Sequence, residues 1–341
     1  MKKIVFDILN NDNGISYAIK AACSFKSKNK DYQIALVADK DIIEKELIKL
    51  KNKYKISIDD FIIVDSKNLV HIKNSPREVL KNSSSMLDAF NYLNENNFDG
   101  IVSSGDSGAF ITLSSFKIKR LPNVSRPAFM PILPTLQNNK YALLLDAGAN
   151  IETSYEYLNN WAVVASQYYE LIFNKQKPSI GLLNVGTEEY KGSANLKEAY
   201  KLLKNNKEVN FTGFIEPKDG IAGNVDIILA EGQSGNIFLK TLEHSFLGFG
   251  KLLKNIINTN LLTKIGGLLL KRQLKKLKAK FDYRNVGGAY IVGLEKLVVK
   301  AHGGSDEIAF ENALNQVKFL LEKKDFVKKL TNKLEVLNNE A

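Results

Sequence analysis

Short apolar runs alternate with amphipathic segments along most of the chain. The apolar runs end near glycine or polar residues, which is typical of buried strands followed by turns. The segments between them place apolar residues at three- and four-residue spacing, which predicts helices. Met86, Leu87, Phe90 and Leu93, for example, would share one helix face. The predicted strands are KKIVFDIL, YQIALVAD, DFIIVD, GIV, YALLLDAGAN, KPSIGLLNVGT, VNFTGFI, VDIILAEG and LEKLVVKAHG, and the predicted helices cover residues 15–26, 42–54, 83–96, 161–174 and 196–205, with a helical tail from about Asp325.

Strands that alternate with helices predict an α/β fold with a largely parallel sheet. The chain has 341 residues, of which 44% are hydrophobic, so it is long enough to bury a sizeable core. We expect a single α/β domain over residues 1–341. In parallel sheets, ligands bind beyond the carboxyl ends of the strands, and the glycine and polar clusters of this sequence fall there.

Five glycine-containing loops follow predicted strands. Glycine allows close backbone approach to a ligand, and a helix that starts after the loop offers unpaired N–H groups to a phosphate. One such loop is also the ordinary form of a strand–helix turn, but five at successive strand ends would converge on one crevice. The candidate binding residues are Ser104, Gly105, Asp106, Ser107 and Gly108; Asp146, Gly148 and Asn150; Asn184 and Gly186; Gly232; and Gly303 and Ser305.

Three basic residues near these loops are the best candidates for binding a dianion, namely Lys191, Lys240 and His302. Lys240 lies one helical turn beyond Asn236, and we expect all four residues to be catalytic. The ordinary alternative for each lysine is a solvated surface charge. The ordinary alternative for His302 is a capping or core histidine.

The sequence lacks the motifs of several enzyme classes. It has three histidines without metal-ligand spacing, and no GxGxxG, GxxxxGK[ST] or GxSxG motif. We therefore expect no metal and no cofactor. Cys23 is the only cysteine, which excludes an intrachain disulfide and favours a reducing compartment. The first residues show no signal peptide, and no run reaches the roughly 18 apolar residues of a spanning helix.

The segment 245–282 differs from the rest of the chain. It accounts for most of the net charge of +11, because residues 251–280 contain nine Lys or Arg and no acid. Its leucines and isoleucines predict two amphipathic helices that meet at an apolar tip, formed by Leu261, Leu262, Ile265 and Leu268. Such a hairpin suits an anionic membrane surface. The hairpin would equally suit contact with an acidic carrier protein or burial in a dimer interface. Nucleic acid is not expected, because the basic run is not interleaved with aromatic residues.

Several stretches together resemble the acyl-carrier-protein-dependent phosphate acyltransferases of bacterial phospholipid synthesis. The resemblance covers nearly the whole chain in order. The stretches that carry it are DGIVSSGDSGA, RPAFMPILPT, LLLDAGAN, KPSIGLLNVGTEEYKG, EGQSGNIFLKTLE, NLLTKIGGLLLKRQLKKLK, VGGAYIVGL and KAHGGSD.

This resemblance implies a three-layer αβα fold related to phosphotransacetylases and to isocitrate and isopropylmalate dehydrogenases. It implies transfer of a long-chain fatty acyl group from acyl carrier protein to inorganic phosphate. It also implies a cytoplasmic homodimer, peripheral on the inner face of the cell membrane, with the hairpin as the membrane contact. Its further partner would be the downstream glycerol-3-phosphate acyltransferase. The family's Ser-Ser motif adds Ser84 to the candidate phosphate-binding residues.

The chain departs from the family pattern at several places in the expected site. Near the start, the family's Asp-Ala-Met-Gly-Gly-Asp is here residues 7–12, with Asn10 and Asn11 in place of the glycines. The family's Gly-Asn-Thr-Gly carries Asp106 here. Its Asp-Gly-Phe carries Glu231 and Gln233, and its Lys-Gly-Asn carries Ser193.

Two alternative functions remain open from the residues alone. A phosphotransacetylase-like enzyme would take acyl-CoA in place of the acylated carrier, although the basic hairpin favours a long-chain substrate and a carrier. A non-catalytic membrane scaffold is the second alternative, and the converging glycine loops argue against it. In the expected reaction a phosphate oxygen attacks the thioester, and positioning and oxyanion stabilisation supply most of the catalysis.

Overall fold

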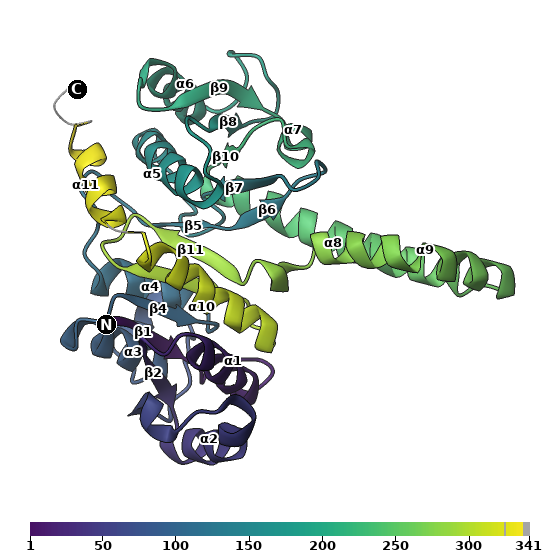
Figure 1. Ribbon diagram of the computed structural model, residues 1–341. Helices are drawn as coiled ribbons and strands as arrows, with labels where there is room; N and C mark the ends of the chain where they lie inside the picture. The colour runs from purple at the N-terminus through teal and green to yellow at the C-terminus, as the bar shows by residue number, and fades with distance from the viewer. Residues whose placement is uncertain (324, 337–341) are drawn as a thin grey trace.

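The computed structural model describes residues 1–323 and 325–336, so the last residues of the predicted tail, 337–341, lie outside the described part. The strands form two sheets, in place of the one sheet that the sequence suggested (Figure 1). The larger sheet has the order β3-β2-β1-β4-β12-β11-β5. Its strands are β1 (Lys2–Asp7), β2 (Tyr32–Ala38), β3 (Phe61–Asp65), β4 (Gly100–Ser103), β5 (Ala128–Met130), β11 (Gly288–Val292) and β12 (Leu297–Ala301).

The smaller sheet has the order β6-β7-β10-β8-β9. Its strands are β6 (Ile132–Pro134), β7 (Tyr141–Leu145), β8 (Ser179–Leu183), β9 (Asn210–Ile215) and β10 (Ile227–Leu229). Most pairings in both sheets are parallel, and the antiparallel ones between these strands are β11–β12, β11–β5 and β6–β7. The predicted α/β class with largely parallel sheets is therefore confirmed.

Helices cover both faces of the larger sheet, because its strands are apolar on both sides. On β1, Ile4 and Phe6 join one buried cluster while Val5 joins the other, as strand alternation requires. The helices α1 (Ile15–Lys28), α2 (Lys40–Tyr54) and α10 (Glu307–Leu321) pack on the first side, and α3 (Ser85–Glu95) and α4 (Ser107–Lys117) on the second. This arrangement is the expected three-layer fold.

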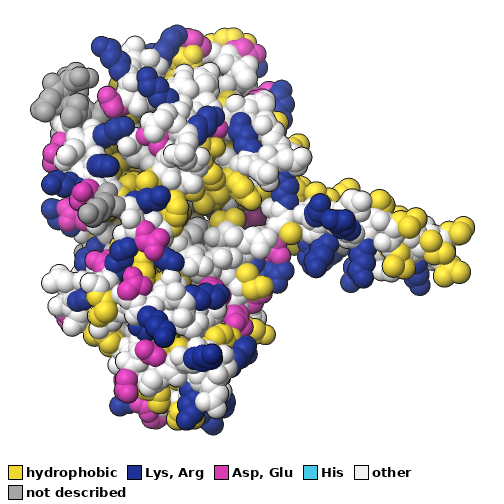
Figure 2. All heavy atoms as spheres, viewed as in Figure 1, with side chains coloured by type: hydrophobic (Ala, Val, Ile, Leu, Met, Phe, Trp, Pro, Cys, Tyr) yellow, Lys and Arg dark blue, Asp and Glu magenta, His cyan; other side chains and the backbone are white. Residues whose placement is uncertain are grey.

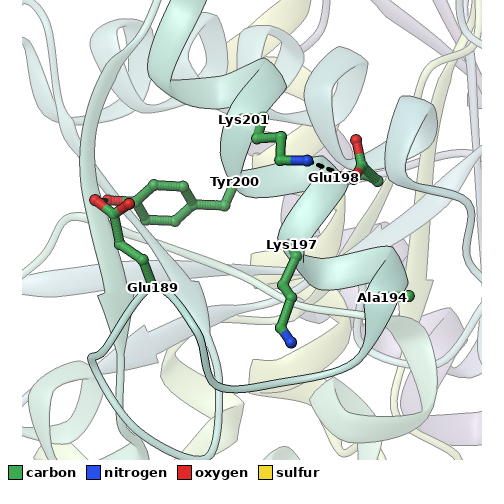
Figure 3. Close-up of a pocket in the computed structure, with 6 residues that line it drawn as sticks. All are labelled: Glu189, Ala194, Lys197, Glu198, Tyr200 and Lys201. Atoms are coloured by element: carbon green, nitrogen blue, oxygen red, sulfur yellow. Dashed lines mark hydrogen bonds and ion pairs between the residues drawn. The ribbon is translucent and has the colours of Figure 1, made fainter.

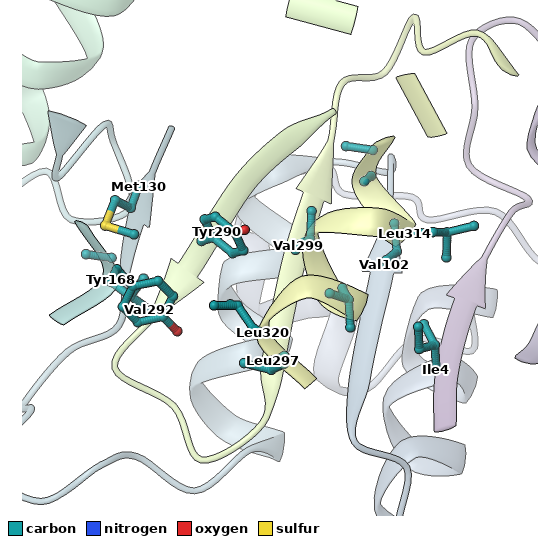
Figure 4. Packing of buried hydrophobic residues seen from close by; sticks show 14 of the residues in the cluster. Ile4, Val102, Met130, Tyr168, Tyr290, Val292, Leu297, Val299, Leu314 and Leu320 are labelled. Carbon is teal, nitrogen blue, oxygen red and sulfur yellow. The ribbon is translucent and has the colours of Figure 1, made fainter. Parts of the chain in front are cut away.

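The smaller sheet shows the same alternation, with Leu143 and Leu145 of β7 in one cluster and Leu144 in the other. Its helices are α5 (Tyr155–Phe173), α6 (Ala194–Asn205) and α7 (Pro217–Ala222), and α11 (Phe326–Val336) packs against α5. The first core cluster runs from one sheet to the other (Figure 4). At the junction, the Tyr168 and Tyr290 rings lie 5.5 Å apart between centroids. Packing therefore joins the two sheets through β5 and β11.

The remaining helices, α8 (Gly232–Ile257) and α9 (Leu261–Lys280), form an arm that projects from the body between the two sheets (Figure 1). The Phe246 and Phe281 rings stack at its base, with centroids 3.8 Å apart. Hydrophobic side chains gather at the free end and basic side chains along the shaft (Figure 2). No helix among the described residues is long and apolar enough to cross a membrane.

The arm differs from the predicted hairpin in one respect. Its first helix begins at Gly232, in the glycine loop after β10, and runs unbroken to Ile257. A continuous helix of this length spans about 39 Å. It connects the strand ends of the smaller sheet directly to the exposed tip.

Candidate active site

A buried polar network holds the ends of β1 and β4 together. The Asp7 carboxylate is fully buried and accepts hydrogen bonds from Ser85 Oγ at 2.8 Å and Ser103 Oγ at 2.7 Å. Asn10 Nδ2 donates to Ser85 Oγ at 2.8 Å and to Asp7 at 3.3 Å. Burial raises the pKa of Asp7, and these hydrogen bonds act in the opposite direction. The network fixes the two loops that follow these strands.

The loop after β4 carries most of the first predicted cluster. Ser104 Oγ donates to the backbone carbonyl of Asn10 at 2.8 Å, and Gly105 N donates to Ser103 Oγ at 3.1 Å. A side-chain carbon at Gly105 would press on the end of the Met86 side chain and on Asn10 Cβ, so a larger residue there would require both side chains to shift. Asp106 caps α4, because its Oδ1 accepts from Ala109 N at 2.8 Å.

Ser107 and Gly108 form the first turn of α4, where helix N–H groups point toward the loop. Ser84 is a helix cap as well, and its Oγ accepts from Leu87 N at 3.3 Å at the start of α3. Both helix starts therefore face the ends of β1 and β4. Ser84 itself lies beside Ser85, which bonds to Asp7.

Lys300, the fourth residue of β12, is a buried cation in the same region. Only 8% of it is exposed. Its Nζ donates to the backbone carbonyls of Ala301 at 2.6 Å and Ser104 at 3.1 Å. Burial lowers its pKa to about 8, against the charges of Asp106, Asp12 and Asp7, which raise it. Lys300 therefore links β12 to the loop after β4.

His302 follows β12 and lies close to helix α8. Burial lowers the pKa of His302, and the nearby charges include Glu243 and Lys240 of α8 as well as Lys300 and Asp12. The imidazole is therefore neutral at physiological pH and can donate or accept a hydrogen bond. Gly304 N lies 3.3 Å from His302 Nδ1, an arrangement that leaves the proton on Nε2.

The glycine loop after β7 packs directly under the start of α8. The Asp146 carboxylate is buried and accepts from the backbone N–H groups of Phe129, Gly148, Ala149 and Asn150 and from Asn150 Nδ2, at 2.8–3.1 Å. Burial raises the pKa of Asp146, and these donors offset part of that effect. The Asp146 carboxylate thus organises its own loop.

Two glycines of α8 permit this contact. Side-chain carbons at Gly232 and Gly235 would overlap the backbone carbonyl oxygens of Asn150 and Asp146. Gly148 is left-handed, with φ of 113°, and a side-chain carbon there would lie 3.0 Å from Asn236. The close packing places Asn236 over the loop, and Lys240 follows one turn later with a 2.8 Å ion pair to Glu243.

The cluster after β8 is more exposed. Asn184 is buried, and its Nδ2 donates to the carbonyls of Gly186 and Lys191 at 3.2 Å. Its Oδ1 has no hydrogen-bond partner among the described residues. Lys191 pairs with Glu188 at 2.8 Å and folds over Gly186. Asn195, at the start of α6, donates to Glu231 at 2.7 Å, which ties this cluster to the start of α8.

A pocket of about 300 Å³ lies on the α6 side of this cluster (Figure 3). Tyr200 donates to Glu189 at 2.7 Å on one wall, and Lys201 pairs with Glu198 on another. A second pocket, of about 500 Å³, includes Asn150 and Arg126. Both lie beside the predicted loops rather than at the Lys300 and His302 end.

The structure brings many of the predicted residues together. Ser104 to Gly108, His302 and Gly303 meet at the ends of β4 and β12, and Gly303 contacts Asp12. Ser305 is fully buried, and its Oγ has no hydrogen-bond partner among the described residues. Lys300 was missed by the sequence analysis. The available signal was a single charge inside the apolar strand LVVKA.

Residues 2–328 match the family described as fatty acid synthesis protein. The chain belongs to this family. A phosphate acyltransferase from Mycoplasma mobile is 41% identical over 94% of this chain and 97% of its own length. Another from Clostridium botulinum is 37% identical over 96% of this chain and 99% of its own. The resemblance to phosphate acyltransferases and the expectation of an acyltransferase are confirmed.

Solved structures bear out the fold. A phosphotransacetylase from Streptococcus pyogenes superposes with a TM-score of 0.62 at 18% identity, and covers 94% of both chains. A 4-hydroxythreonine-4-phosphate dehydrogenase from Klebsiella pneumoniae reaches 0.51 at 10% identity, over 94% of this chain and 99% of its own. At such identities the likeness concerns the fold alone.

Two of the departures from the family pattern, Asn10 and Ser193, have clear structural roles in this chain. Asn10 bonds to Asp7 and Ser85, and its Oδ1 accepts from Val70 N at 3.0 Å. Asn11 Nδ2 is buried with no hydrogen-bond partner among the described residues. Ser193 caps α6 by accepting from Leu196 N at 3.2 Å. Gln233 is exposed in the first turn of α8. The first loop thus keeps polar contacts where the family carries two glycines.

Proposed function

We propose that this protein transfers a long-chain acyl group from acyl carrier protein to inorganic phosphate. The observation that carries the proposal is that Lys240 of α8 lies near Lys300 of β12 and near His302, which follows β12, so that, in addition to burial, the charge of Lys240 lowers the pKa of both residues. Helix α8 starts on the smaller sheet and β12 belongs to the larger one. The arrangement therefore gathers basic and hydrogen-bonding groups at the carboxyl ends of strands from both sheets, where an anionic substrate would bind.

In the proposed reaction a phosphate oxygen attacks the thioester carbonyl carbon. The tetrahedral intermediate collapses, the C–S bond breaks, and the carrier leaves as a thiolate. A thiol of pKa roughly 8.5 leaves with little acid help. Phosphate is already ionised near neutral pH, so a strong general base is not required. Catalysis then depends on holding two anionic partners and on donors for the oxyanion.

We assign roles to the residues on this basis. Lys191 and Lys240 supply positive charge to phosphate, and His302 and Asn236 supply neutral N–H donors. Backbone N–H groups of the glycine loops line the site. Ser84 and Asp106 act as caps that set the orientation of α3 and α4.

We further propose that the arm docks on an anionic membrane surface, where the enzyme acts on its long-chain substrate. The nine basic residues of the segment 251–280 suit both this surface and the acidic acyl carrier protein. A homodimer and contact with a downstream glycerol-3-phosphate acyltransferase, on the inner face of the membrane, complete the proposal.

A turnover assay tests the reaction. The purified chain is incubated with long-chain acyl carrier protein and phosphate, and acyl phosphate is trapped as the hydroxamate. We expect phosphate-dependent product. The same assay with acyl-CoA tests the phosphotransacetylase-like alternative. If kcat/KM for acyl-CoA is equal to or above kcat/KM for the acylated carrier, the protein is a phosphotransacetylase-like enzyme instead.

A further inference from the structure

Lys300 is an unusual residue for its place in the fold. The other residues of β12, Leu297, Val298, Val299 and Ala301, are apolar and buried. A charged side chain in such a strand must lose most of its hydration. Among the described residues Lys300 forms no ion pair within 4.0 Å, and two backbone carbonyls are its partners. Two carbonyls alone are weak compensation for a buried ammonium.

The surrounding charges suggest why the cation is kept. Against the lowering effect of burial, carboxylates on three elements raise the pKa of Lys300 through their charge, namely Asp106 at the start of α4, Asp12 in the loop after β1 and Asp7 at the end of β1. The hydroxyl groups of Ser85 and Ser103 donate hydrogen bonds to the Asp7 carboxylate and stabilise its charge. Asp106 uses one oxygen to cap α4, so its charge stays in the loop next to Ser107 and Gly108. The nearby cationic or titrating groups are Lys240 on α8 and His302 after β12.

Two carboxylates beside an anion-binding loop would repel phosphate. A cation held by the carbonyls of Ser104 in the loop and Ala301 in β12 cancels part of this repulsion. It also ties the loop after β4 to the end of β12.

We propose that Lys300 is a positioning residue for phosphate, whose ammonium offsets the carboxylates of Asp106 and Asp12 and holds the Ser104 loop against β12. The inference rests on the proposed function, because phosphate is the anion considered. It assigns Lys300 an electrostatic role that acts through Asp106, rather than a contact with the reacting atoms.

Charge removal and charge rescue test this role. The variants are Lys300→Met, Asp106→Asn and the double variant. Asn is as good a helix cap as Asp, so Asp106→Asn leaves α4 intact. We expect Lys300→Met to weaken phosphate binding by about one to two orders of magnitude. Removing the Asp106 charge in the double variant should recover at least half of that loss on a logarithmic scale. Unchanged affinity in Lys300→Met, or no recovery in the double variant, overturns the proposal.

The pH dependence of wild type and Asp106→Asn keeps the proposal testable even if Lys300→Met does not fold. Lys300 loses its charge as the pH rises through about 8, and the carboxylates are then uncompensated. Phosphate affinity of the wild type should therefore fall between pH 7.5 and 9.5. The fall should be clearly smaller in Asp106→Asn. An equal fall in both proteins contradicts the electrostatic role.

The main readout, calorimetric titration of inorganic phosphate, measures binding and does not require turnover. The KM for phosphate is measured in parallel. If the wild type binds phosphate but makes no acyl phosphate, the proposed function is wrong, and phosphate binding by the variants still tests the role of Lys300. If turnover is present and the variants bind phosphate like wild type, only the role of Lys300 fails.

Discussion

The carbonyl oxygen of Asp146 occupies the place where a side-chain carbon at residue 235 would stand. Gly235 belongs to the first turn of α8, and Asp146 opens the loop after β7. This contact sets the height of α8 above the smaller sheet. Asn236 and Lys240 on the same helix are thereby placed relative to His302 on the larger sheet.

Gly235→Ala should therefore lower turnover without unfolding the protein. The added methyl group forces α8 away from the loop, and a displacement of about 1 Å at a catalytic group costs roughly a hundredfold in rate. Gly248→Ala on the same helix is the matched control, because a side-chain carbon there meets nothing within 4 Å. The measurement is kcat for both variants, with circular dichroism for folding. Equal kcat values for the two would show that the contact is not required.

Lys191→Ala should reduce turnover by one to two decades while the fold is retained. Losing a charged donor to phosphate costs about 1.5–3 kcal/mol. Lys201→Ala is the control, since Lys201 also pairs with a glutamate three residues away, at 2.7 Å, and is exposed. Exposed ion pairs of this kind contribute little to stability. A kinetic profile of Lys191→Ala that matches Lys201→Ala would remove Lys191 from the site.

His302 should act as a neutral donor, because burial lowers its pKa. His302→Ala should reduce turnover by one to two decades, and His302→Gln should retain more of it because an amide can still donate. The comparison is made with kcat/KM at pH 7.5. If both variants are equally impaired, the donor assignment is wrong; if neither is impaired, His302 is not part of the site.

The tip residues Leu261, Leu262, Ile265 and Leu268 are each more than half exposed, with Leu262 at 81%. The double variant Leu261→Asp/Leu262→Asp should no longer bind anionic vesicles, because each buried leucine contributes about 1.5–3 kcal/mol to insertion. Turnover with soluble substrate should persist. Ile42→Asp/Ile48→Asp on α2 serves as the control, since both isoleucines are exposed far from the arm.

Flotation with vesicles and sedimentation velocity of the tip variant separate two uses of the arm. Loss of flotation in a protein of unchanged mass supports membrane contact. A tip variant that sediments as a smaller species than wild type assigns the same leucines to an interface between copies of the chain.

Lys300 should make stability depend on pH. Its pKa is about 8 in the folded protein, below its ordinary value of 10.5. Between about pH 8 and 10.5, Lys300 is protonated more in the unfolded chain than in the folded protein. The contribution of Lys300 to the free energy of unfolding therefore rises with pH in this range. Below about pH 8 the buried charge lowers the free energy of unfolding by a constant amount. The rise should reach up to about 3 kcal/mol. Urea unfolding at pH 7.5 and 10 should show a rise in the free energy of unfolding for wild type and for Lys201→Met, but not for Lys300→Met. An equal rise in all three proteins would contradict this prediction.

The sequence by itself determined much of the local structure. Apolar runs that end at glycine predicted the strands β1, β4, β7 and β10 because a buried parallel strand needs apolar residues on both faces. The helices α1, α2, α3 and α6 were predicted within about two residues of their ends, whereas α5 begins six residues before its predicted start, α8 begins well before the predicted hairpin, and α10 was not predicted. The arm was visible because a basic, acid-free segment with an apolar stripe is distinctive. The motif set gave the family, since its order along the chain is specific.

Tertiary structure decided which strands pair and which loops meet. The strands β5 and β6 have three residues each, too few to show a period, yet β5 extends the larger sheet and β6 pairs with β7 in the smaller one. Asp146 was predicted to bind phosphate, and only the fold shows that its carboxylate also accepts hydrogen bonds from its own loop. Lys300 looked like one charge in an apolar strand, and only the fold places Asp12 and Asp106 around it. Burial and charge proximity between distant segments depend on long-range packing, which local sequence patterns do not encode.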